Sequence, residues 1–330
     1  MKILITGGAG FIGSHLAARY LENGDEVFII DNLSTGSLSN LKNLQENDKY
    51  KARLHVTIDD CLDYDVMLEL VGICDVVVHL AAAVGVNYVI DNPLSSIVTN
   101  IKGTECILEL CDKFKKKVLI ASTSEVYGKH DHAPLVETDD SVFGPSTKSR
   151  WSYAAAKLMD EFTGLAYNYT KNLPVIVVRF FNTVGPRQTG RYGMVIPRFV
   201  KQALRGEEIT VYGDGTQTRT FTHVEEVVTS VINLINCESA VGEVVNIGGV
   251  EEVSMHDLAE KIVELSKSKS TIKIIPYDEA YPKEFEDMQR RVPSTEKLRK
   301  LTGVAPEKEL EEILIDVINF FKNETDGEFI

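Results

Sequence analysis

Short apolar runs alternate with stretches of helical periodicity through the first half of the chain. The apolar runs lie at residues 3–6, 26–31, 53–57, 76–80, 118–122 and 175–179. Stretches with helical periodicity lie between several of these runs, at residues 14–23, 94–114 and 153–169. The alternation predicts parallel strands joined by crossover helices. Because residues 76–78 and 175–178 are apolar throughout, we expect strands that are covered on both faces, as in a doubly wound sheet.

The pattern changes after about residue 182, where Gly185, Pro186, Gly213 and Gly215 indicate loops. The elements predicted there are shorter: helices at 224–235, 255–265 and 310–321, and strands at 244–247 and 272–275. We therefore predict an α/β protein with two parts. Residues 1–181 form the doubly wound domain, and residues 182–330 form a smaller α/β substrate-binding lobe, with some exchange of chain between them.

A glycine-rich segment, Thr6-Gly7-Gly8-Ala9-Gly10-Phe11-Ile12-Gly13, follows the first strand and opens the first helix. Glycines at 7, 10 and 13 allow a tight turn and let backbone N–H groups approach a pyrophosphate at the positive end of the helix. The second strand ends at Asp31, where a carboxylate can accept hydrogen bonds from both hydroxyls of an adenosine ribose. It would repel a 2′-phosphate, so the pattern predicts a Rossmann domain that binds NAD rather than NADP.

Further cofactor contacts are expected where other strands end. Asp60 and Cys61 follow the third strand, and the Asp60 carboxylate can accept from an adenine amino group, although an ordinary loop carboxylate is the alternative. Small residues after the fourth strand would let the backbone pass close to the cofactor, and His79 before them is interpreted as a packed histidine. The remaining residues assigned to the cofactor site are Phe11, Ile12, Asn32, Leu80, Ala81 and Ala82.

Tyr153 and Lys157 are four residues apart and therefore share one face of a predicted helix. An ammonium beside a phenol lowers the phenol pKa, which gives a base that can take a hydroxyl proton while NAD accepts the hydride. Thr123, at the end of the fifth strand, adds a hydroxyl that can hold the substrate oxygen. Tyr and Lys often meet at this spacing by chance, so the prediction of an oxidoreductase depends on all three residues and on the glycine segment together.

Composition limits the other possibilities. With 35 Lys and Arg against 49 Asp and Glu, the formal charge is −14, which disfavours binding to nucleic acid. We expect no membrane segment and no signal peptide, and hence a cytoplasmic location. The five cysteines show no C-x-x-C spacing, so we expect reduced thiols and no metal site.

These motifs resemble the extended short-chain dehydrogenase/reductase family that acts on nucleotide sugars. The resemblance runs from the glycine segment through residues 179–187 (Arg-Phe-Phe-Asn-Thr-Val-Gly-Pro-Arg) to residues 211–215 (Val-Tyr-Gly-Asp-Gly). It implies tightly held NAD, a UDP-sugar substrate, a C-terminal substrate lobe, and a homodimer formed through helices of the Rossmann domain. It also implies a catalytic set of Thr123, Tyr153 and Lys157.

Three reactions of this family begin with oxidation of the sugar C4 hydroxyl. In the 4,6-dehydratases the corresponding segment resembles Thr-Asp-Glu, whereas this chain has Thr123-Ser124-Glu125 and lacks that acid. The 4-epimerases leave Glu125 unexplained. UDP-glucuronate decarboxylases resemble residues 122–128 closely, and some also resemble Arg150-Trp151-x-Tyr153 and the segment at 286–293, which places Arg291 at the sugar.

The resemblance therefore favours decarboxylation of a UDP-hexuronate, either UDP-glucuronate or its 2-acetamido analogue, to a UDP-pentose or 4-keto pentose. Ser124, Glu125 and Arg291 join the catalytic set. Two alternatives stay open for these residues, since Glu125 could instead bridge to a nearby arginine and Arg291 could bind the diphosphate. The alternative functions are a 4-epimerase, then a 4,6-dehydratase, and, from another class, an NAD-binding regulator without turnover.

The C-terminal lobe supplies the remaining substrate contacts. Asn182 follows the sixth strand, where the resemblance implies a contact to the diphosphate or the sugar. Tyr212 packs against the nucleotide base in relatives, although a plain turn before Gly213 is the alternative. Arg219 can hold a pyrophosphate with its planar fork of donors. The residues assigned to substrate binding are Asn182, Val195, Tyr212, Gln217, Arg219 and Arg291.

Overall fold

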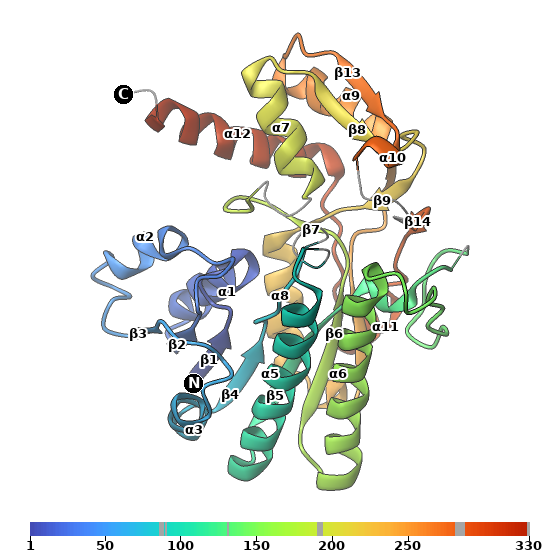
Figure 1. The fold of residues 1–330 in the computed structure, drawn as a ribbon. Coiled ribbons are helices and arrows are strands. Elements are labelled where there is room, and N and C mark those ends of the chain that lie inside the picture. Colours follow the sequence, from blue (N-terminus) through green and yellow to red (C-terminus); the bar gives the residue numbers. More distant parts are fainter. Residues whose placement is uncertain (86–88, 90, 131, 190–193, 281–287, 329–330) are drawn as a thin grey trace.

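A seven-stranded sheet forms the larger part of this computed structural model (Figure 1). The structure describes residues 1–85, 89, 91–130, 132–189, 194–280 and 288–328, and the side chains up to residue 323. All neighbouring strands of the sheet run parallel, in the order β11-β6-β5-β4-β1-β2-β3. The strands are β1 (Lys2–Thr6), β2 (Glu26–Ile30), β3 (Leu54–Thr57), β4 (Val76–His79), β5 (Lys117–Thr123), β6 (Val175–Phe180) and β11 (Val244–Ile247).

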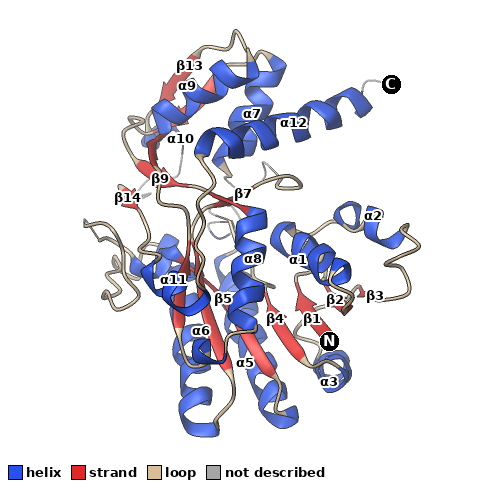
Figure 2. Ribbon diagram, turned by 180° about the vertical axis from the view of Figure 1, so that it is seen from behind, coloured by secondary structure: helices blue, strands red, loops and turns tan. Residues whose placement is uncertain are grey.

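Helices cover both faces of this sheet, as its apolar strands predict. One core joins alternate strand residues such as Ile3 and Ile5 to α1 (Phe11–Glu22), α8 (Val224–Ile235) and α11 (Glu296–Thr302). The other core joins the intervening residues, such as Leu4, to α3 (Tyr64–Ile73), α5 (Pro93–Phe114) and α6 (Arg150–Lys171). Figure 2 shows the helices on the two sides of the sheet. The doubly wound α/β class predicted from the sequence is confirmed.

A second group of elements lies above the carboxyl ends of the strands (Figure 1). Its separate apolar core packs helices α7 (Val195–Arg205), α9 (Met255–Ser266) and α12 (Leu310–Glu328) together. Strands β8 (Ile209–Tyr212) and β13 (Ile272–Ile275) pair in parallel beside them. Small strands complete the region: β7 (Thr183–Val184) with β10 (Thr222–His223), and β9 (Thr218–Thr220) between β12 (Glu252–Ser254) and β14 (Arg290–Arg291). The short helices are α2 (Lys42–Gln45) and α10 (Tyr277–Ala280).

The chain crosses between the two groups more than once. Strand β11 pairs with β6 at the edge of the large sheet, and α8 belongs to the core that contains α1, although the sequence analysis grouped both with the C-terminal lobe. Segments after residue 182 therefore contribute to the large sheet and its core. The division into two domains at residues 181 and 182 stays a prediction. Among the described residues, a search for a helix that is long and apolar enough to span a membrane finds none.

Candidate functional site

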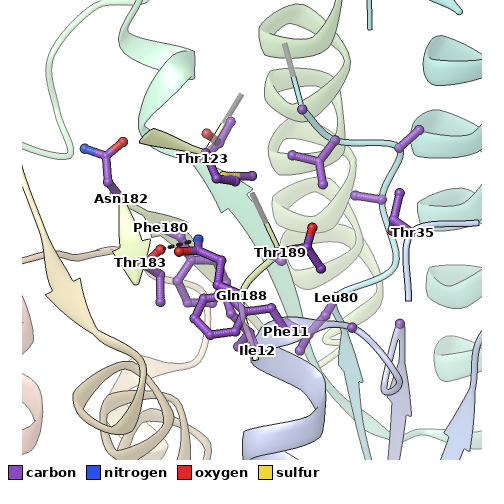
Figure 3. Close-up of a pocket in the computed structure, with 18 of the residues that line it drawn as sticks. Phe11, Ile12, Thr35, Leu80, Thr123, Phe180, Asn182, Thr183, Gln188 and Thr189 are labelled. Carbon is purple, nitrogen blue, oxygen red and sulfur yellow. Dashed lines mark hydrogen bonds between the residues drawn. The ribbon is translucent and has the colours of Figure 1, made fainter. Parts of the chain in front are cut away.

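A cleft of about 610 Å³ lies at the carboxyl ends of the parallel strands, between the sheet and the C-terminal lobe. This is where ligands bind in open α/β sheets. Every residue that the sequence predicts for catalysis, cofactor binding or substrate binding lines it. Figure 3 shows Phe11, Ile12 and Leu80 toward one end of the cavity and Thr123 and Asn182 toward the other.

The glycine turn between β1 and α1 leaves a cradle that a side chain would fill. Gly7 has φ of +69°, and a Cβ there would lie 2.9 Å from the Ala81 backbone nitrogen. A Cβ on Gly13 would lie 2.4 Å from the Gly7 carbonyl oxygen. Gly10 precedes the helix without a side-chain cap, so the first amides of α1 face the cleft uncovered. This cradle of backbone donors fits a pyrophosphate.

Asp31 follows β2 beside this turn and is 8% exposed. Its carboxylate accepts hydrogen bonds from the backbone N–H groups of Ala9 and Leu33, both at 2.9 Å. Burial raises the Asp31 pKa, while these backbone hydrogen bonds oppose the rise. A negative carboxylate with further lone pairs facing the cleft suits ribose hydroxyls and disfavours a 2′-phosphate. The residues present therefore fit NAD.

The predicted adenine side of the cleft is formed by Asn32, Asp60 and Cys61. Asn32 donates a hydrogen bond of 2.8 Å to the Asp60 carboxylate, which joins the loops after β2 and β3. Cys61 is buried, and burial raises its thiol pKa to about 12, so this cysteine stays protonated. Ala81 follows β4 against Gly7, which explains why the chain has small residues there. Leu80 and Ala82 line the same wall.

Tyr153 and Lys157 lie on one face of α6, but their electrostatic relationship differs from the prediction. Lys157 donates a hydrogen bond of 2.7 Å to Asp160, and both side chains are buried. Burial and the charges of Glu125 and Asp160 raise the Tyr153 pKa, and a hydrogen bond with Thr123 opposes the rise. The expected lowering of the Tyr153 pKa by Lys157 was wrong for this structure, because burial, together with the charges of Glu125 and Asp160, outweighs it.

A cluster of charged side chains lies next to Tyr153. Glu125, in the short helix η2 (Ser124–Tyr127), has its carboxylate 3.3 Å from Nη1 of Arg291 and 3.6 Å from Nη2 of Arg150. Arg291 also donates to Ser124 Oγ at 3.5 Å and to Asn182 Oδ1 at 3.2 Å. The bridge from Glu125 to an arginine, which the sequence analysis left as an alternative, is therefore present. Two guanidinium groups therefore contact one carboxylate next to Tyr153.

The C-terminal lobe contributes a separate wall. The Arg198 guanidinium lies 3.9 Å from the ring centroid of Tyr212, and Gln217 donates a hydrogen bond of 2.7 Å to the Tyr212 carbonyl oxygen. Arg219 is buried and donates to the Thr218 and Gln289 carbonyl oxygens. Val195 begins α7 at the cleft. Residues 286 and 287 of the segment that suggested Arg291 lie outside the described residues.

Sequence reasoning gave no role to three side chains in this region. Arg150 and Arg198 line the cleft, and Asp160 pairs with Lys157. Spacing along the helices offered a signal, since Arg150 precedes Tyr153 by three residues and Asp160 follows Lys157 by three. Residues three apart share a helix face. The predicted helix began at residue 153, whereas α6 begins at Arg150, so Arg150 was not recognised as a neighbour.

Comparison with known proteins identifies the family. Residues 4–317 match the family model described as GDP-mannose 4,6 dehydratase. The chain thus belongs to the extended short-chain dehydrogenase/reductase family, whose members are NAD-dependent enzymes that modify nucleotide sugars.

Within this family, two relatives named as decarboxylases are similar to this chain over almost its whole length. A UDP-N-acetyl-alpha-D-glucosaminuronate decarboxylase of Bacillus cytotoxicus is 42% identical over 97% of this chain and 98% of its own length. A UDP-glucuronic acid decarboxylase 1 of Danio rerio is 35% identical over 98% of this chain and 73% of its own. A solved UDP-glucuronic acid 4-epimerase of Bacillus cereus, in complex with UDP-glucuronic acid and NAD, superimposes with a TM-score of 0.87 at 29% identity, covering 98% of this chain and all of that one.

Proposed function

We propose that this enzyme binds NAD and a UDP-hexuronate, oxidises the sugar at C4 and removes its carboxylate as carbon dioxide. The observation that carries the proposal is the cluster in which Arg150 and Arg291 share Glu125 beside Tyr153. Guanidinium groups next to the reacting centre suit a substrate that itself carries a carboxylate, because their planar forks of donors match its two oxygens. Both relatives reported above with decarboxylase names act, by those names, on uronates.

The reaction divides between the two parts of the site. Tyr153, in its phenolate form and beside Thr123, accepts the proton of the C4 hydroxyl. Bound NAD would supply the hydride acceptor that makes this step an oxidation. With C4 as a ketone, the C5 carboxylate belongs to a β-keto acid, so the C5–carboxylate bond breaks and its electron pair enters an enolate. Arg291 and Ser124 stabilise the enolate oxygen electrostatically. A proton is then delivered to C5, where it replaces the lost carboxylate.

In this proposal residues 1–181 hold the cofactor and residues 182–330 hold most of the UDP group. Lys157 orients the phenol and the cofactor ribose. Asn182 and Arg219 contact the diphosphate, Tyr212 the base, and Val195 and Gln217 the remaining wall. Their shared cleft supports this assignment, because cofactor and sugar must meet at Tyr153.

The second candidate is a 4-epimerase, and the likeness to the Bacillus cereus enzyme favours it. That reaction also begins at C4 and also takes a carboxylated sugar. It would leave the carboxylate in place, so the two functions are separated by product mass. A dehydratase is less well supported, because Ser124 stands where that reaction needs an acid.

The experiment is incubation of the NAD-loaded enzyme with UDP-glucuronate and, separately, with its 2-acetamido analogue. Loss of one carbon dioxide from the product mass supports the proposal, and a further difference of two hydrogens distinguishes a pentose from a 4-keto pentose. Unchanged mass with an inverted C4 centre would establish the epimerase instead. The preferred substrate of the two identifies the substituent at C2.

Two variants test the division of roles. Tyr153→Phe should abolish the appearance of NADH, because no base remains for the C4 proton. Glu125→Gln should slow carbon dioxide release more than C4 oxidation, because it disturbs the partners of Arg291 and leaves Tyr153 in place. Equal loss of NADH formation in both variants would contradict this division.

The homodimer is a further part of the proposal. Helix α6, which lies beside α5 in Figure 1, exposes Met159 (52%), Phe162 (60%) and Tyr169 (88%). Large apolar side chains concentrated on one helix mark an interaction surface. We propose that a second copy of this chain covers this surface. Light scattering should then give the mass of a dimer. Phe162→Glu should give the monomer mass, and a dimer that survives this change would place the interface elsewhere.

A further inference from the structure

Lys157 and Asp160 form a pair of buried charges on α6. The side chains are 3% and 2% exposed, and Nζ lies 2.7 Å from Oδ2. An ammonium and a carboxylate are costly to bury separately, so each compensates the other. Lys157 also lines the cleft, whereas Asp160 does not. Asp160 therefore acts on the reaction through its contact with Lys157.

Polar groups of α5 and the sheet lie next to this pair. Burial raises the Asp160 pKa, and the Lys157 charge and the Thr104 hydroxyl of α5 oppose the rise. Thr104 Oγ1 lies 3.2 Å from His79 Nε2, and His79 Nδ1 lies 2.8 Å from Thr6 Oγ1. Thr6 Oγ1 accepts from the Ala81 backbone N–H at 3.1 Å.

The surroundings of His79 determine its charge. Burial and the nearby Lys157 charge lower the His79 pKa to about 3, so the imidazole is neutral. Its two nitrogens lie within hydrogen-bond distance of Thr104 and Thr6, which connects α5 with the strand residue that precedes Gly7.

Several other charged groups face this pair, and each is compensated elsewhere. Glu161, the next residue of α6, accepts two hydrogen bonds from Arg179 of β6, at 2.9 and 2.8 Å, and one from Ser122 of β5. Glu125 of η2 contacts Arg150 and Arg291. His79 of β4 is neutral. Asp160 is thus the carboxylate that is paired with Lys157.

We propose that Asp160 is a positioning residue for Lys157: its buried carboxylate fixes the ammonium and sets the pH range in which Tyr153 and Lys157 work together. The proposal rests on the proposed function for the role of Tyr153 as the base. It concerns residues that the family resemblance and the sequence analysis did not assign.

The physical consequence follows from the sign of the charge. A negative group raises the pKa of neighbouring acids, and Asp160 contributes to the raised pKa of Tyr153. Its removal should make Tyr153 ionise at lower pH. A buried ammonium without its countercharge also gives up its proton more readily. Both limbs of the pH profile should therefore move in the same direction, toward lower pH.

The experiment is the pH dependence of C4 oxidation in wild type, Asp160→Asn and Thr104→Val. Asp160→Asn should move the acidic and alkaline limbs of kcat/KM to lower pH by about one unit. Thr104→Val keeps the charge, so its limbs should stay within about 0.3 unit while kcat falls a few-fold. If Asp160→Asn lowers the activity but leaves both limbs of the pH profile in place, the proposal is overturned. A merely structural role would lower the maximum of the profile without moving its limbs along the pH axis.

A second readout needs neither substrate nor cofactor. Phenolate absorbance of wild type minus that of Tyr153→Phe reports the Tyr153 ionisation, and the same difference is measured in the Asp160→Asn background. The ionisation should begin at lower pH in that background, and an unchanged onset would refute the proposal. If no uronate is decarboxylated, this measurement still stands. If Asp160→Asn does not fold, Asp160→Ser removes the same charge with a smaller side chain.

Discussion

The cofactor end and the sugar end of the cleft are constructed in different ways. The cofactor end consists largely of backbone atoms and small residues from one short segment, residues 6–13, held against Ala81 and Asp31. The sugar end consists of long charged side chains from distant parts of the chain. Glu125 and Arg291 are 166 residues apart in sequence and meet through a single ion pair.

The cofactor end is preorganised by fixed backbone geometry, whereas the sugar end is preorganised by electrostatic contacts between charged side chains. Backbone amides at the start of α1 have fixed directions as soon as the turn forms, so the cofactor end tolerates little added volume. The sugar end depends on the balance between two guanidinium groups and one carboxylate, which a substrate can change. We therefore expect substitutions at the first end to act on binding of NAD and substitutions at the second to act on turnover.

The largest effect is expected for Gly13→Ala. Its Cβ would lie 2.4 Å from the Gly7 carbonyl oxygen, a backbone atom that cannot move aside without opening the turn. The dissociation constant for NAD, measured by calorimetry, should rise by more than about a hundredfold, which corresponds to about 3 kcal/mol. Gly72→Ala is the matched control, because it also adds a methyl group inside a helix but meets nothing closer than 3.5 Å. Similar losses in both variants would show that the turn has no special role.

Arg291→Lys should come next and should act at the other end. Lysine keeps the charge but cannot reach Ser124, Glu125 and Asn182 together, as the planar fork does. We expect kcat/KM to fall about a hundredfold, a loss of 2 to 3 kcal/mol, with NAD affinity unchanged. Arg290→Lys is the neighbouring control, since Arg290 is exposed and pairs with Glu252. Weakened NAD binding in Arg291→Lys would remove the distinction between the two ends.

Acid should weaken the cofactor end through His79. Its pKa is about 3 in the folded protein against an ordinary value of 6.5, so the folded state excludes a proton that the unfolded state binds. The stability that depends on neutral His79 is present above about pH 6.5 and is lost progressively as the pH falls toward 3. At pH 5 the loss should be about 2 kcal/mol, measured by denaturant unfolding. His79→Gln, which does not titrate, should show a flatter pH dependence, and equal slopes would contradict the neutral form.

The comparison also explains how far the sequence could predict the site. Gly7 to Gly13 and Asp31 were interpretable because local spacing determines their geometry. The doubly wound sheet followed from its apolar runs for the same reason. The contact of Arg291 with Glu125 was reached through resemblance alone, because spacing along the chain says nothing about two segments that meet through tertiary structure. The Tyr153 prediction missed Asp160 because it considered one charged neighbour and not the whole buried environment.

Asp60→Ala should have the smallest effect and should test the limit of the cofactor end. Asp60 lies in the loop after β3, where it accepts hydrogen bonds from the Asn32 side-chain amide at 2.8 Å and from the Leu62 backbone N–H at 3.0 Å. If this carboxylate also accepts from the adenine amino group, its loss removes about 1 kcal/mol, and NAD should bind about fivefold more weakly. Asn32→Ala removes one partner of Asp60 and leaves the carboxylate, so it separates the two contributions. If Asp60→Ala leaves the affinity unchanged, the geometric preorganisation ends at Asp31, and the ordinary loop carboxylate is the correct interpretation of Asp60.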